Sequence, residues 1–426
     1  MIKYLQMRPF SRPLIVWVAG ILLQVVCPSF VYILFFSLPL LFFFLVFQWV
    51  IARKITHVFS YDARWVWGVV YCSLLFFLSV QKTACSQLEW KNEPRVSAIR
   101  QWAEDRQSQL LSSLDSLQLS DQEKSVLATI TIGYRKSMDR EVRKRFSVAG
   151  VAHILAVSGF HVGVVCGFVF FILSFLPRSL LSKWIKYLFT ILLLWLFVVV
   201  TGLSASAVRA ALMLTIYLTG YLLRRNTDKY NILVASAFCM LVYEPLYLFD
   251  IGFQLSYAAV FSILYLQPRL KRMIEVRNPL LAYPWDCITV TVAAQVGTTF
   301  LCLYYFGQFS LVFLLTNLPL TFLALLLIPA GIIWMLLPAG FPGYGYLQSV
   351  VEYLTGSMLR LVDLFSRISF SSLAFSFSFP LLLASYGVLF LSLSYIRTKR
   401  PVYLLGTLSL VLILSIGLLI EKIKQC

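Results

Sequence analysis

Charge is scarce in this sequence, and so is histidine. Asp, Glu, Lys and Arg make up 13% of the 426 residues, hydrophobic residues make up 60%, and histidine occurs three times. Soluble domains carry about 25% charged residues, so the composition excludes a soluble globular protein and indicates an integral membrane protein. The eight cysteines show no Cys-x-x-Cys spacing, which argues against a cysteine metal site or redox centre.

A phosphate-binding loop of the Gly-x-x-x-x-Gly-Lys-Ser/Thr type is also absent. Any active transport by this chain therefore needs a separate ATPase, a proton gradient, or pulling of the cargo from the cytoplasm. No small-residue cleavage site follows the first apolar stretch, so we expect that stretch to remain as a membrane helix.

What the sequence does have is a series of apolar stretches, most of them near the roughly 20 residues that a spanning helix needs. They lie at 14–27, 30–51, 65–81, 151–176, 186–200, 204–223, 231–242, 252–267, 287–305, 309–337, 379–396 and 401–420. We predict an all-α fold, a polytopic membrane protein of about twelve helices with a short helical extracytoplasmic segment. The expected domains are membrane helices at 1–81, the extracytoplasmic segment at 82–150, a central membrane domain at 151–396, and a last helix and tail at 397–426.

Lys and Arg in short loops predict the orientation, because cytoplasmic loops are enriched in them. The basic loops around Arg12, Arg53, Lys183, Arg225 and Arg272 fall on one side if each stretch through 252–267 crosses once. We therefore expect a multi-pass protein of the cytoplasmic (inner) membrane with a cytoplasmic N-terminus and with segment 82–150 outside.

Beyond residue 305 this rule needs one more crossing, because otherwise Arg397, Lys399 and Arg400 would lie outside. Either Asn317 to Pro319 breaks the stretch 309–337 into two passes, or segment 346–369 crosses the membrane. The alternative is that 346–369 lies flat as an amphipathic interfacial helix, and the side of the C-terminus stays open.

The extracytoplasmic segment has its own helical signals. Apolar residues at helical spacing predict a helix over 95–118, and Ser120-Asp-Gln-Glu123 has the form of a capping box that starts a second helix towards Gly133. A third helix is expected after Ser137. Six cations then form what we call the basic collar: Arg135, Lys136, Arg140, Arg143, Lys144 and Arg145. The collar either faces lipid headgroups or attracts a polyanion.

Two of the three histidines occur in Gly150-Val-Ala-His-Ile-Leu-Ala-Val-Ser-Gly-Phe-His161, where an apolar stretch begins. Polar groups are costly there unless they have a partner or face a cavity. On one continuous helix His153 and His161 would be separated by about 12 Å, too far to share a metal ion. We expect no metal, no cofactor and no catalytic residue; the two histidines either line a path or bond to neighbouring backbone.

Arg209 lies about one turn inside a predicted span, in Gly202-Leu-Ser-Ala-Ser-Ala-Val-Arg-Ala. It needs a partner, and the segment from Glu244 to Ser256, which contains Asp250, begins at the same predicted depth. The arginine either holds two helices together by a salt bridge or exposes its charge to a translocation path.

Four blocks of the sequence resemble, in order, the signature blocks of the ComEC family of competence proteins. They are His153-Ile-Leu-Ala-Val-Ser-Gly-Phe-His161, Thr201-Gly-Leu-Ser with Arg209-Ala, Gly252-Phe-Gln-Leu-Ser-Tyr-Ala258, and Gln295-Val-Gly297 followed by Asn317-Leu-Pro319. The matching positions are His153, Ser158, Gly159, His161, Arg209, Gly252, Gln254, Ser256, Gln295, Asn317 and Pro319. Phe160 and Thr299 depart mildly from the pattern, where leucine and proline are commoner.

The resemblance implies that 151–396 is a competence-type channel domain that passes single-stranded DNA across the cytoplasmic membrane during natural transformation. It also implies a separate DNA receptor, a cytoplasmic ATPase and a nuclease as partners, and it leaves a homodimer open. Longer family members resemble an assembly with an OB-fold and a metallo-β-lactamase-like domain. The short stretch between Lys82 and Pro94 and the lack of a His-x-His-x-Asp-His motif argue against both domains here, so we expect no enzyme activity.

Two other functions remain alternatives. A small-molecule or lipid transporter would also have broken helices near Pro319 and a charged residue in a span. An intramembrane serine protease is similar in having a sequence such as Val157-Ser-Gly159 inside a membrane helix. That serine would need a base, yet no histidine follows residue 161, and Ala156 replaces the glycine of a Gly-x-Ser-Gly motif.

Overall fold

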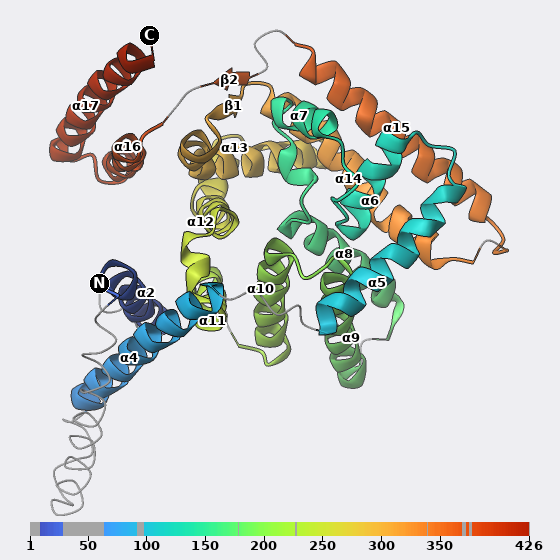
Figure 1. Cartoon of the computed structure of the whole chain (residues 1–426), viewed down its shortest axis with the longest axis horizontal. Coiled ribbons are helices and arrows are strands. Elements are labelled where there is room, and N and C mark those ends of the chain that lie inside the picture. Colours follow the sequence, from blue (N-terminus) through green and yellow to red (C-terminus); the bar gives the residue numbers. More distant parts are fainter. Residues whose placement is uncertain are drawn as a thin grey trace, which may run out of the picture. The chain divides into compact units, whose positions relative to one another are not determined.

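The computed structural model describes residues 9–28, 64–91, 98–177, 179–225, 228–338, 340–368, 372–374 and 377–425. Within these residues the chain forms fifteen α-helices and one two-stranded ladder, which confirms the all-α fold (Figure 1). The predicted span at 30–51, with its neighbour Arg53, lies outside the described residues. The chain divides into two compact units, the first with residues 1–101, 177–191 and 208–254, the second with 102–176, 192–207 and 255–426.

The polytopic character is also confirmed. Among the described residues six helices contain a segment long and apolar enough to cross a membrane: α4 (Arg64–Lys91), α9 (Leu180–Val200), α10 (Ala205–Leu222), α13 (Pro279–Phe306), α14 (Phe313–Leu336) and α16 (Phe379–Thr398). Apolar helices of shorter span are α2 (Ser11–Val26), α8 (Gly159–Ile172), α11 (Lys229–Tyr243) and the apolar part of α17 (Pro401–Gln425). Helix α12 (Ile251–Lys271) lies between α11 and α13 in the chain.

In the first unit, α2 fits closely between α4 and α11. A Cβ added at Gly20 would lie 2.8 Å from the Cβ of Ser79, so only glycine permits this approach. The Ser79 hydroxyl donates to the Trp17 carbonyl over 2.6 Å, and the Trp17 indole donates to the Leu241 carbonyl over 3.0 Å. These bonds give the polar groups of an apolar helix pair the partners that they need.

The second unit contains a buried hydrophobic core, where α6 (Asp121–Ile132), α7 (Arg140–Val148), α8, α14 and α15 (Tyr344–Ser366) meet. Phe146, Leu127 and Trp334 are almost fully buried in it. Gly331 of α14 lies so close to α6 that an added Cβ would be 2.6 Å from a methyl group of Thr131. Helices α6 and α7 of segment 82–150 thus share one core with the apolar helices α8 and α14.

The three helices predicted for segment 82–150 are present, and the ends of the second are confirmed, whereas the first is shorter than the predicted 95–118. Helix α5 covers Ala98–Ser113, followed by the 3-10 turn η1 (Leu114–Ser116). Ser120 and Glu123 form the capping box of α6, which ends at Gly133 with a φ of 74°. Asp139 caps α7 by accepting a hydrogen bond from the Glu141 backbone N–H. These local signals act within a few residues, so the sequence alone reveals them.

The region between α13 and α16 is an excursion that returns to its starting level. Strand β1 (Gln308–Ser310) directly follows α13 and pairs antiparallel with β2 (Ser372–Ala374), which leads to α16 (Figure 1). Helices α14 and α15 run antiparallel between the two strands, because Trp334 at the end of α14 packs on Tyr344 at the start of α15. Of the alternatives left open for this region, a break at Asn317 to Pro319 is wrong, since α14 continues through these residues.

This excursion places the last basic loop without an extra crossing. Helices α13 and α16 are antiparallel, as the ring pair Tyr304–Phe379 and the hydrogen bond from the Tyr386 hydroxyl to the Gly297 carbonyl show. The loop from Arg397 to Arg400 therefore lies at the same end of this helix pair as the basic loop from Arg269 to Arg277. Because α14 and α15 together return to the level at which they start, both basic loops lie at one end without the additional crossing that we expected. Among the described residues, α15 is also not one of the helices apolar enough to span.

Candidate functional site

The histidine block is not the start of one continuous helix. The 3-10 turn η2 (Ala152–Ile154) carries His153, and α8 begins only at Gly159. The predicted continuous helix from residue 151 is therefore wrong, and the separation worked out along that helix does not apply. The apolar character of Ile154 to Val157 concealed the break, while Ser158 and Gly159 were its local signal, since serine is a preferred N-cap.

The end of α7 explains why the chain turns just before this block. Gly150 has a φ of 78°, and an added Cβ would lie 2.7 Å from the Ser310 hydroxyl. Ser310 donates to the Val148 carbonyl over 3.0 Å, and Thr316 donates to the Ala149 carbonyl over 2.7 Å. Hydroxyl groups from β1 and α14 thus satisfy the last carbonyls of α7, which a helix end leaves without partners.

His161 is fully buried in the first turn of α8. Its Nδ1 accepts a hydrogen bond from the Ser158 backbone N–H over 3.2 Å and lies 3.0 Å from the Ser158 hydroxyl. With Nδ1 as acceptor, the proton of the neutral ring is on Nε2. Among the described residues Nε2 has no hydrogen-bond partner. A buried donor without a partner costs about 1–3 kcal/mol, which marks Nε2 as a contact point for something that the fold itself does not supply.

His153 and Asn317 lie together although 164 positions separate them. Their side chains form a hydrogen bond, and Asn317 also donates to the Thr291 hydroxyl over 2.6 Å and accepts from the Thr321 hydroxyl over 3.2 Å. Two residues of the resemblance thus belong to one polar network. The threonines were missed from sequence, where a threonine in an apolar helix gives no signal of its partner.

A cationic side chain, Arg135, lies near the histidine block. His153 and Arg135 both lie close enough to His161 to influence its charge. Desolvation lowers the pKa of His153, and the hydrogen bond with Asn317 acts in the opposite direction. Desolvation and the neighbouring Arg143 lower the pKa of Arg135, but a guanidinium remains charged at neutral pH.

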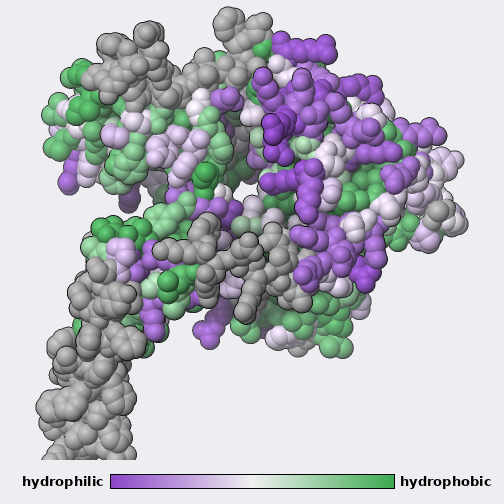
Figure 2. All heavy atoms as spheres, viewed as in Figure 1, coloured by the Kyte–Doolittle hydropathy of each residue, from purple (hydrophilic) through white to green (hydrophobic). Residues whose placement is uncertain are grey.

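Five of the six collar residues have exposed side chains, namely Arg135, Lys136, Arg140, Arg143 and Lys144. Helix α7 buries Val142 and Phe146 in the core, which leaves its cations on the opposite face. Figure 2 shows hydrophilic side chains gathered over the part of the second unit that α5, α6 and α7 form. Exposed Trp102 lies on α5, with the Arg106 guanidinium 5.5 Å from its ring centroid.

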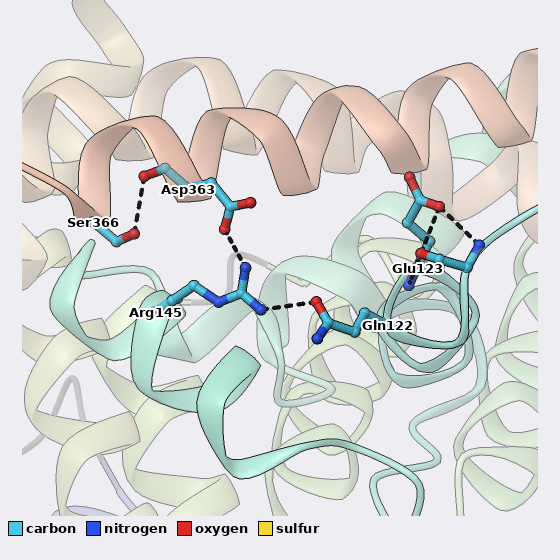
Figure 3. Close-up of polar contacts among 6 residues, drawn as sticks. Gln122, Glu123, Arg145, Asp363 and Ser366 are labelled. Atoms are coloured by element: carbon cyan, nitrogen blue, oxygen red, sulfur yellow. Dashed lines mark hydrogen bonds and ion pairs between the residues drawn. The ribbon is translucent and has the colours of Figure 1, made fainter.

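Arg145 differs from the rest of the collar. Its guanidinium lies 2.6 Å from the Asp363 carboxylate of α15 and donates to the Gln122 side chain of α6 over 2.8 Å (Figure 3). Both partners are distant in sequence, and neither was predicted. Arg145 therefore joins three helices, and the exposed basic surface of α7 consists of Arg140, Arg143 and Lys144.

In the first unit, Arg209 contacts the segment that the sequence assigned to it. The side chain is 3% exposed, donates to the Gly252 carbonyl over 2.9 Å and lies 4.0 Å from Asp250. Asp250 also caps α12 by accepting from the Phe253 backbone N–H over 2.7 Å. Gln254 donates to the Leu248 carbonyl over 3.0 Å. This geometry is that of an arginine holding a helix start in place.

The remaining predicted residues occupy helix surfaces. Ser256 of α12 and Gln295 of α13 are half-buried, and the Gln295 carbonyl accepts from the Thr299 hydroxyl over 2.7 Å. Pro319 of α14 lines a groove with α15. Near the lead-in helix, a Cβ added at Gly133 would lie 2.7 Å from Val157 and 3.2 Å from the Thr201 carbonyl. The end of α6 therefore meets two of the sequence blocks.

The family model described as "Competence protein" matches residues 130–400, well over half of the chain. The chain belongs to the competence protein family. The match begins within α6 and includes α7, η2, α8 and every helix that carries a site residue. The histidine block, the Asn317 network and the exposed basic surface of α7 are thus parts of the competence domain.

Two curated relatives were found. ComE operon protein 3 of Bacillus subtilis (strain 168) is 28% identical over 277 residues, which is 65% of this chain and 34% of the relative. Recombination protein 2 of Haemophilus influenzae is 21% identical over 178 residues, 41% of this chain and 22% of the relative. This competence-family chain thus spans about a third or less of each relative, and no solved structure matches it.

Proposed function

We propose that this protein is a membrane channel for single-stranded DNA in natural transformation. The observation that carries the proposal is the combination, in one unit, of the exposed cations Arg140, Arg143 and Lys144 with the buried, unpartnered Nε2 of His161. Single-stranded nucleic acid is held mainly through its phosphates by cations, with aromatic side chains as stacking platforms. Exposed Trp102 offers one such platform. Membership of the competence protein family supports DNA uptake as the process.

The orientation follows from the same proposal. Segment 82–150, with the basic surface of α7, would face the outside of the cytoplasmic membrane, where DNA arrives. The N-terminus and the loops around Arg272 and Arg400 would face the cytoplasm. The relative placement of those two loops at one end of α13 and α16 supports this assignment.

The partners and the energy source would come from other proteins. A DNA receptor outside, an ATPase inside and a nuclease for the other strand are the expected partners, and we assign no covalent chemistry to this chain. A transporter of small molecules or lipids is less well supported, because α14 passes through Pro319 unbroken, and a broken helix was one of the two features that favoured it.

The decisive test follows labelled DNA into the cytoplasm of host cells that lack the gene. Wild type should restore uptake, and His161→Ala should fail to restore it while reaching the membrane in normal amount. His161→Gln and Ser158→Ala serve as companions, because the first retains a side-chain donor and the second removes only the hydroxyl beside Nδ1. Normal uptake in the deletion strain, with no second family copy present, would refute the channel.

A further inference from the structure

A groove runs between α14 and α15 on the surface of the second unit. It has a volume of about 410 Å³ and is lined by Pro319, Phe322 and Leu323 of α14 and by Tyr353, Ser357, Arg360 and Leu361 of α15. Small-ligand sites have volumes of about 300–1,000 Å³. Six of the seven lining side chains are uncharged, so Arg360 is the one ionised group in this groove.

Arg360 is an exposed cation with no acidic partner in ion-pair distance among the described residues. Its Nε donates to the Gly356 carbonyl over 3.3 Å, which directs the guanidinium along the helix. The Glu123 carboxylate also lies near Gly356: its Oε2 accepts from the Ser120 backbone and hydroxyl in the capping box, while its Oε1 is on the side of Gly356 and Arg360 but outside ion-pair distance of the guanidinium. Arg145 of α7, by contrast, has Asp363 of α15 as its counter-ion. Arg360 thus has a carboxylate nearby but no ion pair within the described residues, and its exposed guanidinium can pair with an anion from outside the fold.

The surroundings of the groove indicate what kind of anion. Along α15 the side chains of Tyr346, Val350, Tyr353 and Leu364 are 47–85% exposed, and their spacing of four, three and eleven residues places them in one stripe with Arg360. Along α14, Leu315, Phe322 and Leu326 are 42–65% exposed and form a second stripe. A free phosphate or a nucleic acid would leave both stripes in water, whereas a lipid would cover them.

The other side of α15 shows why this face is directed outward. Asp363 pairs with Arg145, and Glu352 accepts from the Gln118 backbone N–H over 2.9 Å. These two contacts lie 11 residues apart, about 16 Å along the helix, so α15 rests on the extracytoplasmic layer over most of its length. An amphipathic helix held in this way at the edge of a membrane protein presents its apolar stripe to lipid.

We propose that the groove between α14 and α15 binds an anionic phospholipid. The phosphate would pair with Arg360, with the Tyr353 and Ser357 hydroxyls as additional donors, and an acyl chain would lie along Phe322 and Leu326. Arginine and tyrosine side by side are suited to the interface between headgroups and acyl chains. This site is independent of DNA and does not rest on the channel proposal.

The test uses the full chain in nanodiscs of zwitterionic phosphatidylcholine, with a phosphatidylglycerol titration followed by native mass spectrometry. Wild type should retain phosphatidylglycerol in preference to phosphatidylcholine. Arg360→Gln should weaken that retention at least about tenfold, because a charge-assisted hydrogen bond is lost, whereas Arg360→Lys should keep most of it. Arg367→Gln is the matched control, since Arg367 is an exposed arginine at the end of the same helix but outside the groove.

Two further arms separate the sources of the anion. Millimolar inorganic phosphate should not displace the lipid, and neither should a single-stranded oligonucleotide. Displacement by phosphate would show a simple anion site, and displacement by the oligonucleotide would assign the groove to the DNA path; either result overturns the proposal. If wild type retained phosphatidylglycerol and phosphatidylcholine equally, that measurement alone would overturn the proposal. DNA uptake is not part of these readouts, so the channel proposal and this one fail separately.

Discussion

Replacing Arg140, Arg143 and Lys144 together by glutamine removes the exposed basic surface of α7 and leaves its packing intact. All three side chains are exposed, while Val142 and Phe146 hold the helix in the core. Arg145 is left unchanged because it pairs with Asp363. The matched control exchanges the cations, Arg140→Lys, Arg143→Lys and Lys144→Arg, which keeps the charge and changes only the shape of each donor.

The expected effect follows from counterion release. Each phosphate contact contributes about 0.7 to the slope of log affinity against log salt for a single strand. Three lost contacts therefore lower the slope by about 2. Between about 50 and 200 mM salt, the affinity of wild type should fall by a factor about 20 larger than that of the glutamine variant.

The assay is fluorescence anisotropy of a labelled single-stranded oligonucleotide with the protein in nanodiscs of neutral lipid, repeated at several salt concentrations. Neutral lipid prevents anionic headgroups from competing for the same cations. The charge-preserving control should retain the wild-type slope, whatever happens to its absolute affinity.

A wild-type slope in a normally inserted glutamine variant would show that these cations do not contact DNA. If the variant then bound anionic lipid vesicles more weakly than wild type, the basic surface of α7 would face lipid headgroups instead. That outcome is the alternative that the sequence left open.

Three further predictions concern stability and are checked by thermal unfolding of the purified protein in one detergent. Asp363→Ala should destabilise the protein by about 1 kcal/mol, because it removes the ion pair with Arg145, which is partly exposed and therefore screened. The control Glu141→Ala, which removes an exposed acid of α7, should have no effect. Equal losses of stability in the two variants would show that the ion pair does not hold α7 on α15. Gly331→Ala should destabilise by about 1–3 kcal/mol through the contact with Thr131, whereas Gly163→Ala, with nothing within 4 Å, should be neutral or stabilising; unchanged stability at Gly331 would mean that α6 and α14 move apart at no cost. Arg209→Gln should cost about 2–3 kcal/mol and reduce the amount in the membrane, because a buried charged hydrogen bond to Gly252 is lost, and a stable variant with defective uptake would instead favour a role for Arg209 in the path.

The sequence predicted those features that depend on neighbours in the chain. The capping box at Ser120, the end of α6 at Gly133 and the polytopic all-α character all follow from residues within a few positions of one another. The assignment of Arg209 to the segment around Asp250 also succeeded, because predicted topology placed both at one depth.

Long-range pairs were beyond such reasoning. Arg145 and Asp363 are 218 positions apart, and each has several possible partners in sequence. The break before α8 was not visible in the sequence, because apolar residues continue from η2 through the break into α8 and hydropathy does not distinguish the three parts. The antiparallel return of α14 on α15 was missed because hydropathy counts crossings and gives no sign of two helices that start and end at one level.

Helix α14 links features that the sequence showed as separate. Thr316 holds the end of α7, and the next residue, Asn317, holds His153. Two residues further on, Pro319 faces the groove with Arg360. A rigid helix cannot shift one of these contacts without the others, so the basic surface of α7 and the histidine block keep a fixed relation to each other. A path for a polyanion needs this arrangement. The cations of α7 that attract the phosphates can pass a strand on only if they remain next to the histidine block that contacts it afterwards.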